Sequence, residues 1–291
     1  MSTESPADGA HPSGASTAVP SKAGRNLPAA IAVGVGLGAL VVASLIFVPK
    51  VWFGIVAAAI AIATWEVASR LREGDILVPR IPLLLGGQAT IWLGWPFGTT
   101  GVLAGFTGTV IACFVWRLLD QGLGAAPRNY LRDAAITVFV AAWLPLLASF
   151  GTLMVTREGG SDWVFVLMIG VVCSDVGGYT AGVLFGRHPM VPAISPKKSW
   201  EGLGGSLVFA IIGSVATVTL ILDANPAIGV LLGVVLVVTG TLGDLIESQV
   251  KRDLGIKDMG TLLPGHGGIM DRLDSLLPSA FVTWLVLTAL L

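Results

Sequence analysis

The chain has 291 residues, of which 54% are hydrophobic and only 12% are charged, and its mean hydropathy is +0.84. Soluble domains carry about 25% charged residues, so this composition argues strongly against a soluble globular protein. The net charge of −1 gives no indication of a nucleic-acid partner, and we expect none. Cys113 and Cys173 both lie in apolar runs, which is typical of small buried side chains and not of a disulfide or a metal pair.

The N-terminal residues 1–27 are rich in Ser, Ala, Pro and Gly, a composition that predicts a disordered tail and no signal peptide. Beyond this tail, apolar stretches recur that are long enough to cross about 30 Å of hydrocarbon as helices. The third and fourth stretches are separated by a short break, residues 94–101, that contains Pro96. We therefore predict an all-α, polytopic transmembrane helix bundle of about nine spans: 28–48, 51–69, 79–97, 99–116, 133–154, 163–186, 203–222, 226–243 and 275–291.

The basic residues support this segmentation, which rests on hydropathy alone. When the segments between the spans are assigned alternately to two sides, fifteen of the seventeen Lys and Arg residues fall on one side. The other side holds only Lys50 and Arg157. By the positive-inside rule, the N-terminus and the charged loops are cytoplasmic. The protein is expected to be a multi-pass protein of the cell (inner or plasma) membrane.

The sixth span and the loop that follows it hold the first candidate site residues. Asp175 lies inside an apolar span, where an ionisable side chain is a functional candidate by default. Lys197 and Lys198 either anchor the loop at the membrane surface beside Trp200 or bind a triphosphate. Glu66, near the end of the second span, is either an interfacial carboxylate or a functional one.

The second charged loop, residues 243–274, carries a denser group of polar side chains. Asp244, Glu247, Ser248 and Lys251 are spaced to share one face of a helix that continues the eighth span. A solvated helix end with ordinary ion pairs would give the same spacing. Asp271 and Asp274 are three residues apart before the last span, and together with Asp244 they could supply three carboxylates to one Mg²⁺ ion.

A glycine-rich turn, Pro264-Gly-His-Gly-Gly268, lies between these two acidic groups. Its glycines allow the backbone to approach an anion closely, although His266 alone would more often be a structural residue. Four bases flank the turn, namely Lys251, Arg252, Lys257 and Arg272. Carboxylates for a metal, bases for phosphate oxygens and a glycine-rich cradle are the parts that phosphoryl or nucleotidyl transfer requires.

Three segments of the sequence resemble one family. The run Ser248-x-Val-Lys-Arg-x₄-Lys-Asp-x-Gly-x₂-Leu-Pro-x-His-Gly-Gly-Ile-x-Asp-Arg-Leu-Asp274 is similar to the signature of the phosphatidate cytidylyltransferases, or CDP-diacylglycerol synthases. Ser195-Pro-Lys-Lys-Ser-Trp-Glu-Gly202 and Ser174-Asp-x-Gly-Gly-Tyr179 also resemble family segments. The resemblance spans roughly the C-terminal 120 residues. It implies that CTP and phosphatidic acid react to give CDP-diacylglycerol and pyrophosphate, with Mg²⁺, and for the family a second cation and a homodimer are further expectations.

Roles follow as hypotheses from the resemblance and the residue types together. The expected catalytic residues are Asp271, Asp244, Lys251, Arg272 and His266. The expected metal ligands are Asp244, Asp271, Asp274 and Asp175. The expected phosphate-binding residues are Lys197, Lys198, Arg252, Lys257, Gly267, Gly268 and Ser248.

The same reasoning divides the chain into an N-terminal set of transmembrane helices, 28–160, for lipid access or oligomerisation, and a catalytic part, 161–291. Two alternatives remain open. A related lipid nucleotidyltransferase or a CTP-dependent polyprenol kinase would need similar groups, and a kinase would release CDP instead of pyrophosphate. A cation transporter with Asp175 and Asp244 lining its path would need polar residues across both leaflets, and the first, fourth and seventh spans hold few or none.

Overall fold

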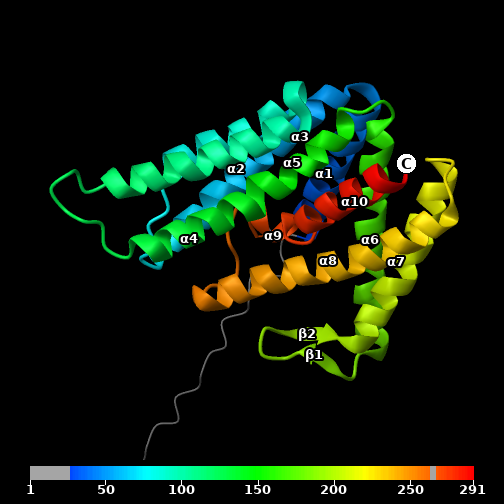
Figure 1. The fold of residues 1–291 in the computed structure, drawn as a ribbon. Coiled ribbons are helices and arrows are strands. Elements are labelled where there is room, and N and C mark those ends of the chain that lie inside the picture. Colours follow the sequence, from blue (N-terminus) through cyan, green and yellow to red (C-terminus); the bar gives the residue numbers. More distant parts are fainter. Residues whose placement is uncertain (1–26, 263–266) are drawn as a thin grey trace, which may run out of the picture.

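The computed structural model describes residues 27–262 and 267–291 (Figure 1). The predicted disordered tail lies almost entirely outside these residues, and so does His266. Most of the described chain is helical. The helices are α1 (Leu27–Phe47), α2 (Pro49–Glu73), α3 (Arg80–Leu119), α4 (Tyr130–Ala141), the π-helix η2 (Ala142–Leu146), α5 (Leu147–Val155), α6 (Gly160–Phe185), α7 (Trp200–Leu220), α8 (Pro226–Asp253), α9 (Met270–Leu273) and α10 (Leu276–Leu290).

The all-α prediction needs one correction, in the loop between α6 and α7. Here β1 (Pro189–Val191) and β2 (Ser195–Ser199) form an antiparallel hairpin, drawn beside the base of α7 in Figure 1. The prolines at 189, 192 and 196 prevent helix formation in this loop. Glu201, in the first turn of α7, closes the hairpin by accepting hydrogen bonds from the N–H groups of Arg187 and His188.

Seven helical segments among the described residues are long and apolar enough to cross a membrane, which makes the chain a multi-pass membrane protein. They are 50–73, 80–119, 130–155, 160–185, 200–220, 226–253 and 270–290. The predicted first span corresponds to α1, of which residues 38–47 form a shorter apolar helix. The predicted count of nine crossings stays a prediction.

The predicted break between the third and fourth spans is present inside α3. Gly98 has φ 56° and ψ −142°, a conformation that interrupts the helix and that glycine adopts without strain. Pro96, just before it, also opposes a continuous helix. The two halves of α3 then pack closely against each other, since a Cβ on Gly105 would lie 2.6 Å from the Cα of Thr90. The segment is a bent helix pair and not one straight rod.

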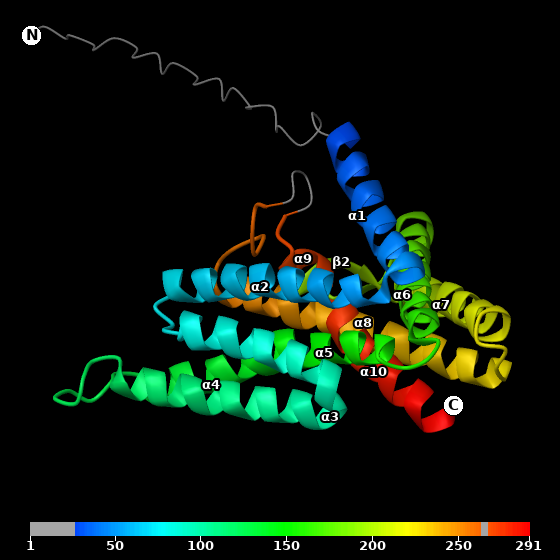
Figure 2. The ribbon, with the colours of Figure 1, turned by 90° about the horizontal axis from the view of Figure 1, so that it is seen from above.

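The connections alternate between two ends of the bundle. Residues 74–79, residues 120–129 and the C-terminal end of α8 lie toward one end in both ribbon views (Figures 1 and 2). Residues 156–159, residues 221–225 and the C-terminus lie toward the other. At the first end, residues 120–129 include Arg128, and the last turn of α8 carries Lys251 and Arg252. The orientation in the membrane stays a prediction.

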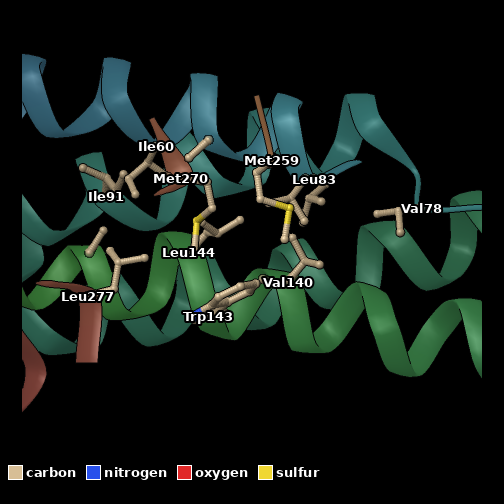
Figure 3. Close-up of a cluster of buried hydrophobic side chains, with 14 of the residues drawn as sticks. Ile60, Val78, Leu83, Ile91, Val140, Trp143, Leu144, Met259, Met270 and Leu277 are labelled. Atoms are coloured by element: carbon tan, nitrogen blue, oxygen red, sulfur yellow. The ribbon is translucent and has the colours of Figure 1, made fainter. Parts of the chain in front are cut away.

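Two apolar clusters hold the bundle together, and both draw on the N-terminal and C-terminal parts of the chain. The first cluster joins α2, α3, α4 and η2 to Met259, Met270 and Leu277 (Figure 3). Met259 is 1% exposed and Met270 is 0% exposed, and full burial of such a side chain stabilises a fold by about 1.5–3 kcal/mol. The second cluster joins α1 and α2 to α6, α7, α8 and α10. The loop that carries the glycine-rich turn is therefore anchored in the core of the N-terminal helices.

Candidate active site

A polar cavity of about 520 Å³ lies among α6, the β hairpin, α7, α8, α9 and the residues that join α9 to α10. It gathers side chains that are up to a hundred residues apart in sequence. The acidic side chains that line it are Asp175, Asp244, Glu247, Asp258, Asp271 and Asp274. The basic side chains that line it are Lys197, Lys198, Lys251 and Arg272. All four predicted metal ligands thus share one cavity with four of the predicted phosphate-binding or catalytic bases.

The face of α8 predicted from the sequence is present and carries the central ion pairs. The helix continues to Asp253, well past its apolar part, and thereby brings Asp244, Glu247 and Lys251 to the cavity. Lys251 Nζ lies 2.6 Å from Glu247 Oε2 and 3.0 Å from Asp271 Oδ1. One ammonium group therefore joins α8 to the start of α9.

Asp271 also accepts hydrogen bonds from two backbone N–H groups of the preceding loop, those of Met259 and Gly268. Its Oδ2 accepts a hydrogen bond from Gly268 N–H at 2.7 Å, and both of its oxygens accept from Met259 N–H at 3.1–3.2 Å. A carboxylate has about four lone-pair positions, and these contacts together with Lys251 use most of them. In this arrangement Asp271 holds residues 259 and 268 together.

The carboxylates of the other predicted metal ligands accept fewer hydrogen bonds than Asp271 does. Asp244 pairs with Lys198 at 2.5 Å, which ties α8 to the β hairpin, and its second oxygen is 3.4 Å from Ser248 Oγ. The carboxylate of Asp175 is repelled by the negative charge of Asp244. It is attracted by the positive charges of Lys198 and Arg272. Asp274 accepts a hydrogen bond from Ser275 N–H at 2.8 Å, and it faces negative charge from Asp244.

Glu247 is a site residue to which the sequence assigned no role. It is 1% exposed, and the negative charges of Asp274 and Asp271 act on it. Its Oε2 meets Lys251, whereas its Oε1 is buried and has no hydrogen-bond partner in the described part of the chain. Its place on the face of α8 was visible in the sequence, but its burial was not.

Glu66 is the second residue whose role the sequence left undecided. It lies on α2, is 9% exposed, and accepts hydrogen bonds from Ile269 N–H at 3.2 Å and from Met270 N–H at 3.0 Å. A Cβ atom on Gly268 would lie 2.6 Å from Glu66 Oε2, and one on Gly260 would lie 2.1 Å from Oε1. Glu66 is therefore a buried carboxylate that holds residues 268–270 against α2, and it is not a solvated interfacial group.

The remaining predicted phosphate-binding residues do not line the cavity; they are Ser248, Arg252, Lys257, Gly267 and Gly268. Arg252 Nε donates to Ile194 O in the hairpin turn at 2.5 Å, and Lys257 is exposed; neither residue lines the cavity. Gly267 has φ +81°, a conformation that favours glycine, and with Gly268 it borders the Asp271 carboxylate. His266 lies outside the described residues.

A divalent cation suits the chemistry of this cavity. Asp274 lies close to the carboxylates of both Asp244 and Glu247, so acidic oxygens gather in one part of the cavity. Such oxygens are the ligands that Mg²⁺ prefers. No three acidic, His or Cys side chains of the described residues form a preassembled metal site, and lysine ammonium groups lie on Asp244 and Asp271.

Comparison with known proteins decides the family. The family model described as "Cytidylyltransferase family" matches residues 28–290. The chain belongs to this family. The match includes the N-terminal helices as well as the charged loops, so the cytidylyltransferase fold extends over both predicted parts of the chain.

Individual relatives in this family carry a more specific name. A protein of Mycobacterium bovis named phosphatidate cytidylyltransferase is 59% identical over 278 residues, which cover 93% of this chain and 91% of the relative. A protein of the same name from Mycobacterium leprae is 58% identical over 280 residues, covering 92% and 90%. A shorter match, 39% identical over 145 residues, links the chain to the phosphatidate cytidylyltransferase of Staphylococcus aureus and covers 49% and 55%.

Proposed function

We propose that this cytidylyltransferase transfers CMP from CTP to phosphatidic acid, giving CDP-diacylglycerol and pyrophosphate. The observation that carries the proposal is the single cavity in which six acidic and four basic side chains meet among membrane-embedded helices. The names of the relatives that align over nine-tenths of the chain point to the same reaction. A site for this reaction must bind both a water-soluble nucleotide and a lipid headgroup. A polar cavity at the ends of apolar helices is accessible to both substrates.

The chemical difficulty of the reaction is electrostatic. The acceptor phosphate monoester already carries about −1.5 to −2 charge near neutral pH, so it needs no strong general base to act as a nucleophile. A phosphate oxygen of the lipid attacks the α-phosphorus of CTP, and the bond to the pyrophosphate leaving group breaks. The protein must bring two polyanions together and hold them in line. Lys197, Lys198, Lys251 and Arg272 are the cavity bases that would neutralise the phosphates.

We further propose that Asp244, Asp274 and Asp175 hold Mg²⁺, with Asp271 joining them if it releases Lys251. When bound, the ion would neutralise phosphate charge and polarise the α-phosphate. Glu247 supports the proposal, because a cation beside its buried Oε1 would relieve repulsion from Asp274. The lysines that lie on Asp244 and Asp271 would then be available for phosphate oxygens.

The topology belongs to the same proposal. Nine spans, a cytoplasmic N-terminus and cytoplasmic charged loops would give the cavity direct access to CTP. The positive-inside asymmetry of the Lys and Arg residues supports this orientation. Location in the cell membrane, a second cation and a homodimer are further parts of the proposal, and they carry none of the chemistry above.

The direct test is an assay of purified protein in detergent with labelled CTP, phosphatidic acid and Mg²⁺. We expect labelled CDP-diacylglycerol and one pyrophosphate per turnover. Asp244→Asn should lower kcat by at least about a hundredfold, since it removes a negatively charged ligand of the proposed Mg²⁺ ion, which would neutralise the reacting phosphates. Asp253→Asn, at the exposed end of the same helix, is the matched control and should be near normal.

Two results would contradict the proposal. Release of CDP, or transfer to a polyprenol but not to phosphatidic acid, would favour the kinase or a related lipid transferase. Near-normal turnover of the Asp244→Asn variant would remove Asp244 from the set of metal-binding residues.

A further inference from the structure

A second pocket lies away from the catalytic cavity, between the end of α2, residues 77–79 and both ends of α3. Its volume is about 330 Å³, and none of its lining residues lines the catalytic cavity. The polar and aromatic residues around it are Trp65, Arg72, Arg80, Trp116, Arg117 and Asp120. Three arginines and one aspartate give the pocket an excess of positive charge.

Two of these arginines carry buried N–H groups without hydrogen-bond partners among the described residues. Arg117 is 3% exposed, and its Nε and Nη2 bind Asp133 at 3.0 and 2.9 Å. Its Nη1 has no hydrogen bond and lies 3.8 Å from Asp120 Oδ2. Arg80 Nε is also buried without a partner. Buried donors of this kind cost free energy unless a ligand or water satisfies them.

The rest of the pocket suits an anion at the surface of a membrane. The Arg80 guanidinium lies over the Trp65 ring at 5.1 Å from its centroid, which fixes the guanidinium in place. The first turn of α3, at Arg80 and Ile81, lines the pocket, and a helix N-terminus favours negative charge. Arg72 is exposed at the rim, and no partner for its side chain is recorded within residues 27–262 and 267–291.

The surroundings of the pocket distinguish a lipid from a soluble anion. Trp65 is 54% exposed and Trp116 is 47% exposed, and tryptophan is enriched at the level of lipid headgroups. Ile81 and Leu77 are also exposed beside the arginines, where acyl chains could cover them. The pocket is lined in part by residues 77–79 and by Asp120. The connections to which these residues belong, 74–79 and 120–129, lie toward one end of the bundle (Figure 2).

We propose that this pocket binds the phosphate group of an anionic phospholipid, separately from the substrate lipid in the catalytic cavity. Arg72 and Arg80 bind the phosphate oxygens, and the buried Nη1 of Arg117 donates a further hydrogen bond to the phosphate. The two tryptophans lie at the level of the lipid headgroups. A soluble phosphate would satisfy the same donors but would leave the exposed apolar side chains in water.

The test is native mass spectrometry of the intact protein released from detergent in the presence of phosphatidylglycerol. This lipid is an anionic phosphodiester and lacks the monoester that the proposed reaction consumes. We expect one tightly bound phosphatidylglycerol, and about tenfold weaker binding in Arg72→Gln, because one charged hydrogen bond is lost. Arg128→Gln, an exposed arginine in the 120–129 connection, removes the same charge and should bind as the unmodified protein does.

Two further binding measurements distinguish an anionic phospholipid from other ligands. Phosphatidylcholine should not show the tight adduct, and millimolar inorganic phosphate should not displace phosphatidylglycerol. Displacement by inorganic phosphate would show that the site binds soluble phosphate and would overturn the lipid assignment. Equal binding by Arg72→Gln and Arg128→Gln, at matched thermal stability, would show that the pocket binds no phospholipid.

Discussion

The contact of Glu66 with the glycine-rich turn leads to a sharp prediction for the variant Glu66→Gln. The wild-type carboxylate accepts two hydrogen bonds, from Ile269 and Met270 N–H, at a site that is 9% exposed. Glutamine keeps one acceptor oxygen but turns its NH₂ group toward the other N–H. A hydrogen bond to a charged group contributes about 1.5–3 kcal/mol, and a loss of about 2 kcal/mol corresponds to roughly 30-fold.

We expect this loss to affect catalysis, because the same few residues carry the Asp271 carboxylate. Asp271 Oδ2 receives Gly268 N–H at 2.7 Å, and Gly268 is packed against Glu66. A displacement of Gly268 therefore displaces Asp271, and misplacement of a catalytic group by about 1 Å can cost about a hundredfold in rate. The prediction is a fall of roughly 30-fold in kcat/KM, mostly in kcat.

The assay is steady-state formation of CDP-diacylglycerol by purified Glu66→Gln, with kcat and the KM for CTP measured separately. Glu73→Gln is the matched control, because it makes the same change on the same helix at a side chain that is 61% exposed and pairs with Arg70 at the surface. The control should stay within about twofold, as exposed ion pairs contribute little. Normal kcat in Glu66→Gln, together with a lowered melting temperature, would show that Glu66 only stabilises the fold and would refute the positioning role.

Two other substitutions test neighbouring features of the structure. Gly268→Ala would put a Cβ 2.6 Å from Glu66 Oε2, so we expect turnover to fall at least about tenfold, whereas Gly204→Ala, with nothing within 4 Å, should be silent in the same assay. Asp133→Asn breaks the buried pair with Arg117, at 1% and 3% exposure, and should destabilise the protein by about 3–5 kcal/mol; a thermal-unfolding midpoint equal to that of the unmodified protein would contradict the argument.

Much of the fold follows from local patterns in the sequence. Apolar length predicts the helices, because each must satisfy its own backbone hydrogen bonds in hydrocarbon. The short break at residues 94–101, which contains Pro96, predicts the interruption of α3 for equally local reasons, and the structure places this interruption at Gly98. The β hairpin was missed, although its three prolines argue against a helix, because no alternating apolar pattern signals its short strands.

In the candidate site, local sequence patterns identify the residues but not their interaction partners. The spacing of Asp244 and Lys251 along α8 is a property of one helix, so it could be predicted from the sequence. Their counterparts across the cavity, Lys198 and Asp271, were recognised as candidates by residue type and family resemblance, but not as the ion-pair partners that the structure records. Pairing depends on how separate helices pack, and charge spacing along the chain contains no such information.

Residue types and their spacing were enough to identify a membrane-embedded protein with the chemical groups for nucleotidyl transfer, because hydropathy and helical periodicity act within a single segment. The roles of Glu66 and Glu247 came from folding alone. Glu66 accepts a hydrogen bond from Ile269 N–H across 203 residues of chain. Glu247 is 1% exposed in the folded chain, where Asp271 and Asp274 act on it. A carboxylate on an isolated helix is hydrated by water. Tertiary packing removes that water, and the buried carboxylate then needs a specific hydrogen-bond or ion-pair partner.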